Sequence, residues 1–372
     1  MKYVLIYAFT PFMFAACREP ENSVITSVPG FRVIHAVDSS RVYKPNSPTN
    51  DYLHFRPLDI DLWYPALAND NDSILTFGDV FGLLESRANY YTASTAWAGI
   101  TNKYAASFCE GFKCSNPETL LRFRTNTRRN AAATPGRFPL ILYLASYNGM
   151  SYENTALLER LATEGYIVAS ISSIGSWPGD MTMKRKDLME QVRDAAFALT
   201  LLKKRPDIDS TRIGVVGYSW GGLAGAVLAA NRTDIDALVS LDGSEFHHYG
   251  TDKHEDTDFD ETKNALLNRS ISTPYLRLES GRGNTTPPEQ VYNFSEKLSK
   301  PGRIFNVDSA AHEDFSHLPM LVRQSGGCAT TRTYDVISKL TTAFLTNCLT
   351  DQTSRFDDSL KTELNNTVRP RL

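Results

Sequence analysis

A serine stands between two glycines at the turn from an apolar strand to an apolar helix. The segment 215–222 reads Val-Val-Gly-Tyr-Ser-Trp-Gly-Gly and contains the pattern G-x-S-x-G around Ser219. A serine on such a turn is held at the carboxyl end of the strand, beside the positive end of the next helix. Gly217 and Gly221 suit the turn because the backbone approaches itself closely there and a Cβ would clash. The pattern predicts a nucleophile elbow carrying Ser219; the alternative is an ordinary glycine-rich turn.

A serine hydroxyl becomes a good nucleophile only when a base accepts its proton, so a histidine is required. In folds with this elbow the acid and then the base follow the serine along the chain. His35 and His54 precede Ser219 and are therefore excluded. Three others come too early after it, in one loop: His247, His248 and His254. We predict His312 as the base, because it follows the last predicted strand across a short loop, and His317 is the weaker alternative.

Two carboxylates could orient this histidine, and each stands at the end of a predicted strand. Asp242 follows one strand and Glu279 follows the next. At the later strand an aspartate would normally turn toward the base, but glycine and asparagine occupy 283–284. We therefore predict Asp242 as the acid. Glu279 is the alternative, and we expect it to pair with Arg277 or Arg282 on the surface.

These residues need a sheet to bring them together, and the sequence predicts one. From residue 138 onward, apolar strand patterns alternate with helical patterns. The continuous apolar run 140–144 is typical of a strand buried on both faces. The predicted strands are 31–38, 53–64, 140–144, 166–171, 212–217, 235–241, 274–278 and 303–307, and the predicted helices are 151–164, 188–202, 221–230 and 336–348. Strands separated by helical crossovers predict an α/β fold with a mostly parallel central sheet, covered by helices on both faces.

The segment 66–136 does not fit this rhythm and is predicted to be an aromatic-rich insertion. It is either a lid over an apolar acyl pocket or packing on the edge of the sheet. Its aromatic side chains are Phe77, Phe81, Tyr90, Tyr91, Trp97, Tyr104 and Phe108.

Several segments resemble the plasma-type platelet-activating factor acetylhydrolases and their bacterial dienelactone hydrolase-like relatives. They are Gly-Tyr-Ser-Trp-Gly-Gly at 217–222, Leu-Asp-Gly at 241–243, Ala-His-Glu-Asp-Phe at 311–315 and Asp-Leu-Trp-Tyr-Pro at 61–65. The resemblance covers roughly Leu53 to Leu349 and implies an α/β-hydrolase fold. It also implies a triad of Ser219, Asp242 and His312, with no cofactor.

The same resemblance bears on the oxyanion hole. The family usually has His-Gly after the strand that supplies it, whereas this chain has Leu-Ala-Ser-Tyr-Asn-Gly at 144–149. Backbone donors survive a change of side chain. The resemblance therefore implies an oxyanion hole made by the backbone N–H groups of Trp220 and Tyr147.

The amino terminus predicts export. Residues 3–16 form an apolar run after Lys2, too short to span a bilayer and suited to the core of a signal peptide. Small residues before Cys17 resemble the lipobox of bacterial lipoproteins, which implies a signal peptide 1–16 and a lipidated tether 17–30. We expect a protein anchored in the bacterial cell envelope through Cys17; the alternative is free secretion. A polar tail, 350–372, is expected to be loosely ordered.

Four further cysteines fit an oxidising compartment. The pairing by proximity in sequence is Cys109–Cys114 and Cys328–Cys348, but four cysteines allow three connectivities and the sequence does not choose. Neither pair has the spacing or flanking histidine of a zinc site.

Composition limits the function. The 372 residues are 42% hydrophobic and 22% charged with a formal charge of −3, so no basic field favours nucleic acid. We expect a single monomeric domain, 31–349, acting on a small-molecule or lipid ester as a serine esterase. The alternatives are a serine peptidase of the same fold and a non-catalytic binding lipoprotein. The segment 245–261 holds three histidines and several acids; we interpret it as a solvated acidic loop rather than a metal site.

Overall fold

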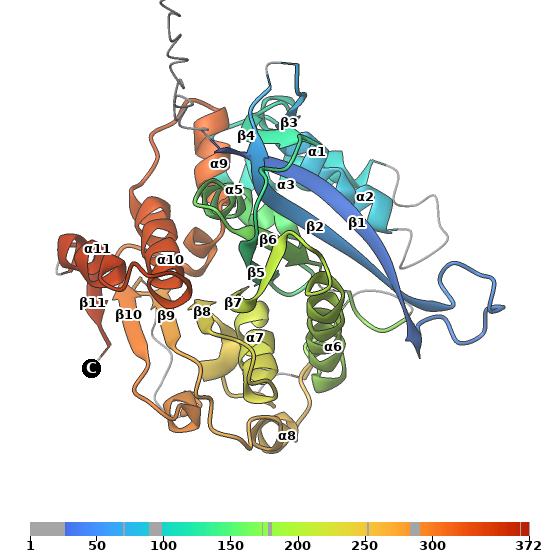
Figure 1. Ribbon diagram of the computed structural model, residues 1–372, viewed down its shortest axis with the longest axis vertical. Helices are drawn as coiled ribbons and strands as arrows, with labels where there is room; N and C mark the ends of the chain where they lie inside the picture. The colour runs from blue at the N-terminus through green and yellow to red at the C-terminus, as the bar shows by residue number, and fades with distance from the viewer. Residues whose placement is uncertain are drawn as a thin grey trace, which may run out of the picture.

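The computed structural model describes residues 27–69, 71–88, 99–172, 174–177, 181–250, 253–282, 291–364 and 366–371 (Figure 1). The predicted signal peptide, Cys17, most of the tether, and Tyr90, Tyr91 and Trp97 lie outside these ranges, as do residues 283–284. Within them, no helix is both long enough and apolar enough to cross a membrane.

The strands of the described residues form one sheet, in the order β11-β10-β9-β8-β7-β5-β6-β2-β1-β4-β3. The strands are β1 (Ser27–Val42), β2 (Phe55–Leu67), β3 (Ile74–Thr76), β4 (Arg124–Arg129), β5 (Phe138–Leu144), β6 (Ile167–Ile171), β7 (Ile208–Tyr218), β8 (Ala237–Leu241), β9 (Tyr275–Ser280), β10 (Arg303–Val307) and β11 (Val368–Pro370). Every pair from β6 through β5, β7, β8 and β9 to β10 is parallel. The prediction of a mostly parallel sheet is confirmed.

Helices cover both faces of this sheet (Figure 1). They are α1 (Phe77–Phe81), α2 (Leu83–Ala88), α3 (Ile100–Phe112), α4 (Pro117–Leu121), α5 (Thr155–Thr163), α6 (Arg185–Leu202), α7 (Trp220–Ala230), α8 (Phe259–Leu266), α9 (Leu318–Ser325), α10 (Thr333–Leu349) and α11 (Arg355–Glu363). Successive side chains of β5 point to opposite faces. Leu140 and Leu142 therefore join the core under α6 and α7, and Ile141 and Tyr143 join the core under α5 and α10.

The described part of the 66–136 insertion extends the sheet and covers one end of it. β4 pairs with β1, and β3 pairs with β4. Phe77, Phe81 and Leu120 of the insertion pack against Leu321 and Val322 of α9. The two interpretations of the insertion are a lid over an acyl pocket and packing on the edge of the sheet, and its described residues pack at the edge of the sheet.

The prediction of a loosely ordered tail at 350–372 is wrong. Helix α11 packs on α10, and β11 pairs antiparallel with β10 (Figure 1). Phe356 is fully buried against Phe305 and Phe344, and the buried carboxylate of Glu363 forms an ion pair with Arg332. The tail is polar overall, yet Phe356, Val368 and the carboxylate of Glu363 are all fully buried, and they dock the tail on the rest of the fold. At the other end, β1 begins at Ser27, inside the segment predicted to be tether.

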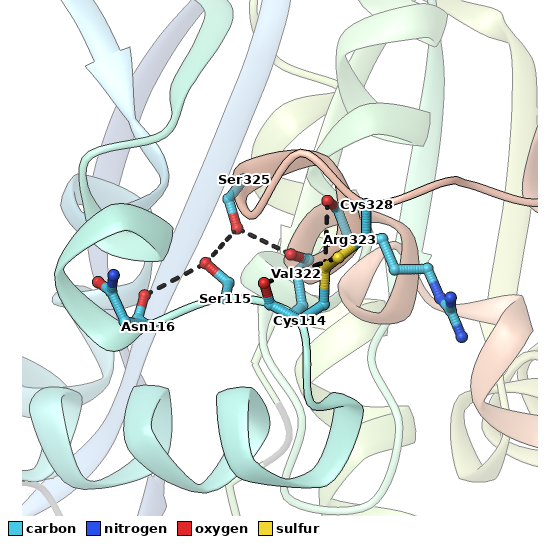
Figure 2. Close-up of a disulfide and its surroundings, with 7 residues drawn as sticks. All are labelled: Cys114, Ser115, Asn116, Val322, Arg323, Ser325 and Cys328. Atoms are coloured by element: carbon cyan, nitrogen blue, oxygen red, sulfur yellow. Dashed lines mark hydrogen bonds between the residues drawn. A yellow bond between two sulfur atoms is a disulfide. The ribbon is translucent and has the colours of Figure 1, made fainter.

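A disulfide joins Cys114 to Cys328, across 214 residues of sequence (Figure 2). The pairing by sequence proximity is therefore wrong, and Cys109 and Cys348 are thiols on α3 and α10. The chain beyond α3 meets the end of α9 at Gly326, where a Cβ would lie 1.9 Å from the carbonyl oxygen of Cys114. This close approach, invisible in the sequence, brings Cys114 to its partner.

Breaking this disulfide is expected to destabilise the protein. Because the bond closes a very long loop, Cys114→Ser and Cys328→Ser should each lower the free energy of unfolding by about 2–4 kcal/mol. Denaturant unfolding with and without a reductant measures the effect. The variants should be insensitive to reductant, whereas wild type and Cys348→Ala should lose the same amount when reduced. A wild-type curve unmoved by reductant would contradict the prediction.

Candidate active site

Ser219 occupies the turn between β7 and α7 with the strained backbone that a nucleophile elbow requires. Its φ is 55°, which is uncommon for a residue with a side chain. A Cβ on Gly217 would lie 2.1 Å from the carbonyl oxygen of Gly221, and one on Gly221 would lie 2.0 Å from that of Leu144. Only glycine fits at either position, so the two glycines permit the turn that presents Ser219.

The structure brings His312 and Asp242 to this serine. The Nε2 atom of His312 lies 3.0 Å from Ser219 Oγ, and its Nδ1 atom lies 2.7 Å from Asp242 Oδ2. With the imidazole proton on Nδ1, which donates to the carboxylate, Nε2 is free to accept the serine proton. The three side chains thus form one hydrogen-bonded chain, in the arrangement that a nucleophile, a base and an acid would need, and they come from the turns after β7, β10 and β8.

Asp242 is held ionised. Burial raises the pKa of its carboxyl, but the hydrogen bond with His312 and the nearby charge of Arg277 outweigh burial, and the pKa lies below its ordinary value. Its second oxygen accepts the backbone N–H of Ser280 at 2.9 Å. At neutral pH the carboxylate can therefore stabilise a protonated His312.

Tyr218 fixes the other side of the base. Its ring stacks on the imidazole of His312 with centroids 5.2 Å apart, and its hydroxyl donates to the backbone oxygen of His312 at 3.1 Å. The side chain of His312 is nevertheless half exposed. A substrate can thus reach the reacting nitrogen from solvent.

Glu279 does not contribute to this chain. It is 1% exposed, and Oε2 accepts Arg277 Nε at 2.7 Å and Arg371 Nη1 at 3.1 Å. The expected partner Arg277 is present, but the expected surface location is wrong, and the second partner comes from the end of the chain rather than from Arg282. Two arginines therefore bind Oε2 of Glu279, whereas Nδ1 of His312 is hydrogen-bonded to Asp242.

The remaining histidines lie elsewhere. His317 is buried at the start of α9 with Nδ1 3.0 Å from Thr155 Oγ1, and burial lowers its pKa to about 3. His247 faces Glu255 at 3.5 Å, and His248 faces Asp260 at 2.5 Å. Among the residues that the structure describes, no group of three or more His, Cys, Asp or Glu side chains could hold a metal ion.

A tight turn beside the serine carries Tyr147. The backbone N–H of Gly149 donates to the oxygen of Ser146 at 2.8 Å, and Asn148 takes a left-handed φ of 54°. The preceding carbonyl, of Leu144, abuts Gly221 in the first turn of α7. The turn therefore lies next to the helix start, where Trp220 has a backbone N–H with no partner within the helix.

The interpretation of 245–261 as a solvated loop is wrong at its first residue. Glu245 is fully buried and accepts hydrogen bonds from Tyr275, Ser240 and Arg277, at 2.6, 2.5 and 2.7 Å. Arg277 also donates to the backbone oxygen of Gly243 at 2.7 Å. This buried network supports the turn that carries Asp242. Its signal in the sequence is the polar residues that interrupt otherwise apolar strands.

A mostly parallel sheet covered on both faces, with a serine elbow facing a histidine and a carboxylate, defines a serine-type hydrolase of the α/β-hydrolase superfamily. The chain belongs to the dienelactone hydrolase family, whose profile matches residues 128–317.

Two curated proteins are similar to parts of the chain. It is 28% identical over 207 residues to the uncharacterized peptidase YuxL of Bacillus subtilis, covering 47% of this chain and 31% of that protein. It is 29% identical over 196 residues to Lipase 1 of Moraxella sp., covering 46% of this chain and 59% of that protein. The matched region is thus less than two thirds of either relative.

Among solved structures, a ferulic acid esterase from Streptomyces cinnamoneus has the same fold. It superimposes with a TM-score of 0.57 over 87% of this chain and 90% of its own, at 22% identity.

Proposed function

We propose that this protein hydrolyses carboxylic esters with short acyl or acetyl groups, through an acyl-enzyme on Ser219. The observation that carries the proposal is the continuous hydrogen-bonded chain from Ser219 Oγ through His312 to Asp242. A small-molecule or phospholipid-like ester is the substrate class, and the chemistry needs no cofactor.

The proposed reaction has two halves. Ser219 Oγ attacks the carbonyl carbon as its proton passes to Nε2 of His312, and Asp242 stabilises the resulting imidazolium. The backbone N–H groups of Trp220 and Tyr147 receive the negative oxygen. The C–O bond then breaks, and His312 returns the proton to the leaving alcohol. Water repeats the sequence on the acyl-enzyme, releasing the acid and restoring Ser219.

A serine peptidase is the second candidate, because one relative is named a peptidase. An alcohol leaves more easily than an amine, so the two activities differ in what they demand of His312 as an acid. The half-exposed imidazole gives an ester access without requiring an extended peptide groove.

A panel of substrates tests the proposal. We expect p-nitrophenyl acetate and butyrate to be turned over at least about 100-fold faster than p-nitroanilides of short peptides, with rates falling as the acyl chain lengthens. A fluorophosphonate probe should label wild type at one serine. Faster cleavage of the anilides would favour the peptidase, and absence of labelling would favour a binding protein.

We also propose that the protein is a monomeric lipoprotein of the bacterial cell envelope, anchored at Cys17. The chain enters β1 at Ser27, so about ten residues separate the anchor from the fold. Because the lipid would hold the protein at the membrane, Cys17→Ser should move it from the membrane fraction to the soluble fraction. Fractionation and immunoblotting measure the shift. A wild-type protein found entirely in the soluble fraction would contradict the anchor.

A further inference from the structure

The proposed mechanism leaves one buried carboxyl near the site without a role. Glu153, in the 3₁₀ helix Ser151–Asn154, is 3% exposed. Its Oε1 atom accepts the hydroxyl of Tyr143 at 2.7 Å and the backbone N–H of Ser146 at 2.9 Å. Its Oε2 atom accepts the hydroxyl of Ser146 at 2.6 Å. Both oxygens thus bind one residue, Ser146.

Ser146 is the first residue of the tight turn that carries Tyr147. The last residue of the turn also faces Glu153, since a Cβ on Gly149 would lie 2.4 Å from Glu153 Oε2. The carboxylate therefore lies under the turn and touches both of its ends. Tyr147, at the second position, has its side chain partly exposed.

Burying this carboxyl is unfavourable for the fold. Its two oxygens accept hydrogen bonds from Tyr143 and Ser146, which are neutral donors, and no Lys or Arg of the described residues forms an ion pair with it. Burial raises the pKa of Glu153 to about 7, although the hydrogen bonds from Ser146 and Tyr143 lower it. A buried acid without a cation costs stability. Its position under the turn offers a reason for its presence.

Other bonds hold the same loop, so loss of Glu153 would loosen the loop without removing it. Gln191 donates to the backbone oxygen of Ala145 at 2.8 Å, and Asn148 Oδ1 accepts the backbone N–H of Met181 at 2.8 Å. Neither of these bonds fixes Ser146. Without Glu153, Ser146 at the first corner of the turn would lose both of the hydrogen bonds that it donates to the carboxyl, one from its backbone N–H and one from its hydroxyl.

We propose that Glu153 is a positioning residue that clamps the Ser146–Gly149 turn and so aims the backbone N–H of Tyr147 at the oxyanion. This inference rests on the proposed function, because only a reaction with an oxyanion needs that donor. Misplacing a donor by about 1 Å, or losing it, lowers kcat by about 10²-fold or more.

The test compares Glu153→Ala with Glu153→Gln in the full chain. Alanine should lower kcat for p-nitrophenyl acetate about 100-fold with KM changed less than about threefold. Glutamine keeps an acceptor for Tyr143 and the Ser146 N–H, and its amide can donate to the Ser146 hydroxyl, so kcat should recover to within about fivefold of wild type. Phenylboronic acid, which forms a tetrahedral adduct on the serine, should bind the alanine variant more weakly by a factor similar to the loss in kcat.

Glu159 supplies a matched control. It is buried on α5, six residues further along the chain, and accepts the backbone N–H of Asn126 at 2.9 Å and the hydroxyl of Thr127 at 2.6 Å. Burial raises its pKa as well. Its partners belong to β4, so Glu159→Ala should lower the melting temperature and leave kcat per folded molecule within threefold of wild type.

The outcomes separate cleanly. Equal losses of kcat in the two alanine variants, or a glutamine variant as slow as alanine, would overturn the positioning role. If Glu153→Ala does not fold, Ser146→Ala replaces it, with an expected five- to tenfold fall in kcat and the same loss of boronate affinity; unchanged kcat would overturn the inference. Ester turnover that does not depend on Ser219 would overturn the proposed function and this inference with it. Ser219-dependent turnover unaffected by Glu153→Ala would overturn this inference alone.

Discussion

Replacing Ser219 with alanine is expected to lower the turnover of p-nitrophenyl acetate by about 10⁴-fold or more. The hydroxyl is the only part of the site that forms the acyl-enzyme, and the loss of a nucleophile in a triad typically costs that much. The fold should remain intact, because the substitution leaves unchanged the glycines at 217 and 221 that permit the turn. Steady-state kinetics on purified protein, with circular dichroism for the fold, measures the effect.

Ser210 provides the control for this substitution. It lies on β7, the same strand, but near its opposite end. Ser210→Ala should keep kcat within about twofold of wild type and should still react with a fluorophosphonate probe. Substantial turnover by a folded Ser219→Ala protein would reject Ser219 as the nucleophile, and with it the acyl-enzyme mechanism.

The parts of the molecule that the sequence predicts well are those with local signals. A continuous apolar run such as β5 identifies a strand buried on both faces, and the change to a helical period identifies each crossover. The nucleophile turn is equally local, since five consecutive residues around Ser219 specify its geometry. The order of elements then restricts the histidine to the region after β10. The structure places His312 there, in contact with Ser219.

The parts that it predicts poorly depend on contacts between distant segments. The partner of Cys114 lies 214 residues away, and it is reached because Gly326 lets two backbones approach closely. The docking of the carboxyl-terminal segment depends on a few buried residues among polar neighbours, namely Phe356, Glu363 and Val368. Glu153 and Glu245 look like surface acids in the sequence, because burial of a carboxyl is decided by donors from other elements. The pattern of hydrophobic residues in the sequence does not show where such donors lie.

The choice of acid gives the second large effect. Asp242→Asn is expected to lower kcat by about 10⁴-fold at neutral pH, the loss seen for this change in the serine-protease triad. An asparagine amide that faced Nδ1 with its N–H₂ group would favour the wrong tautomer, with the proton on Nε2, where it cannot accept from Ser219. Its neutral side chain would also fail to stabilise the imidazolium. The backbone N–H of Ser280 still has an oxygen to bind, so the turn should survive.

Glu279→Gln is the matched comparison, because Glu279 stands at the corresponding end of the neighbouring strand. Its carboxylate binds Arg277 and Arg371 and does not reach His312. Removing the charge leaves two arginines with one fewer counterion, so we expect the free energy of unfolding to fall by about 1–3 kcal/mol. The effect on kcat should be less than tenfold, or about 1.4 kcal/mol of barrier.

The two variants therefore separate stability from catalysis. Asp242→Asn should be folded and slow, and Glu279→Gln should be less stable and active. Chemical unfolding curves and steady-state rates on the same preparations measure both effects. If Glu279→Gln lowered kcat more than Asp242→Asn, the acid would act from β9, and the contact between Asp242 and His312 would not be the productive one.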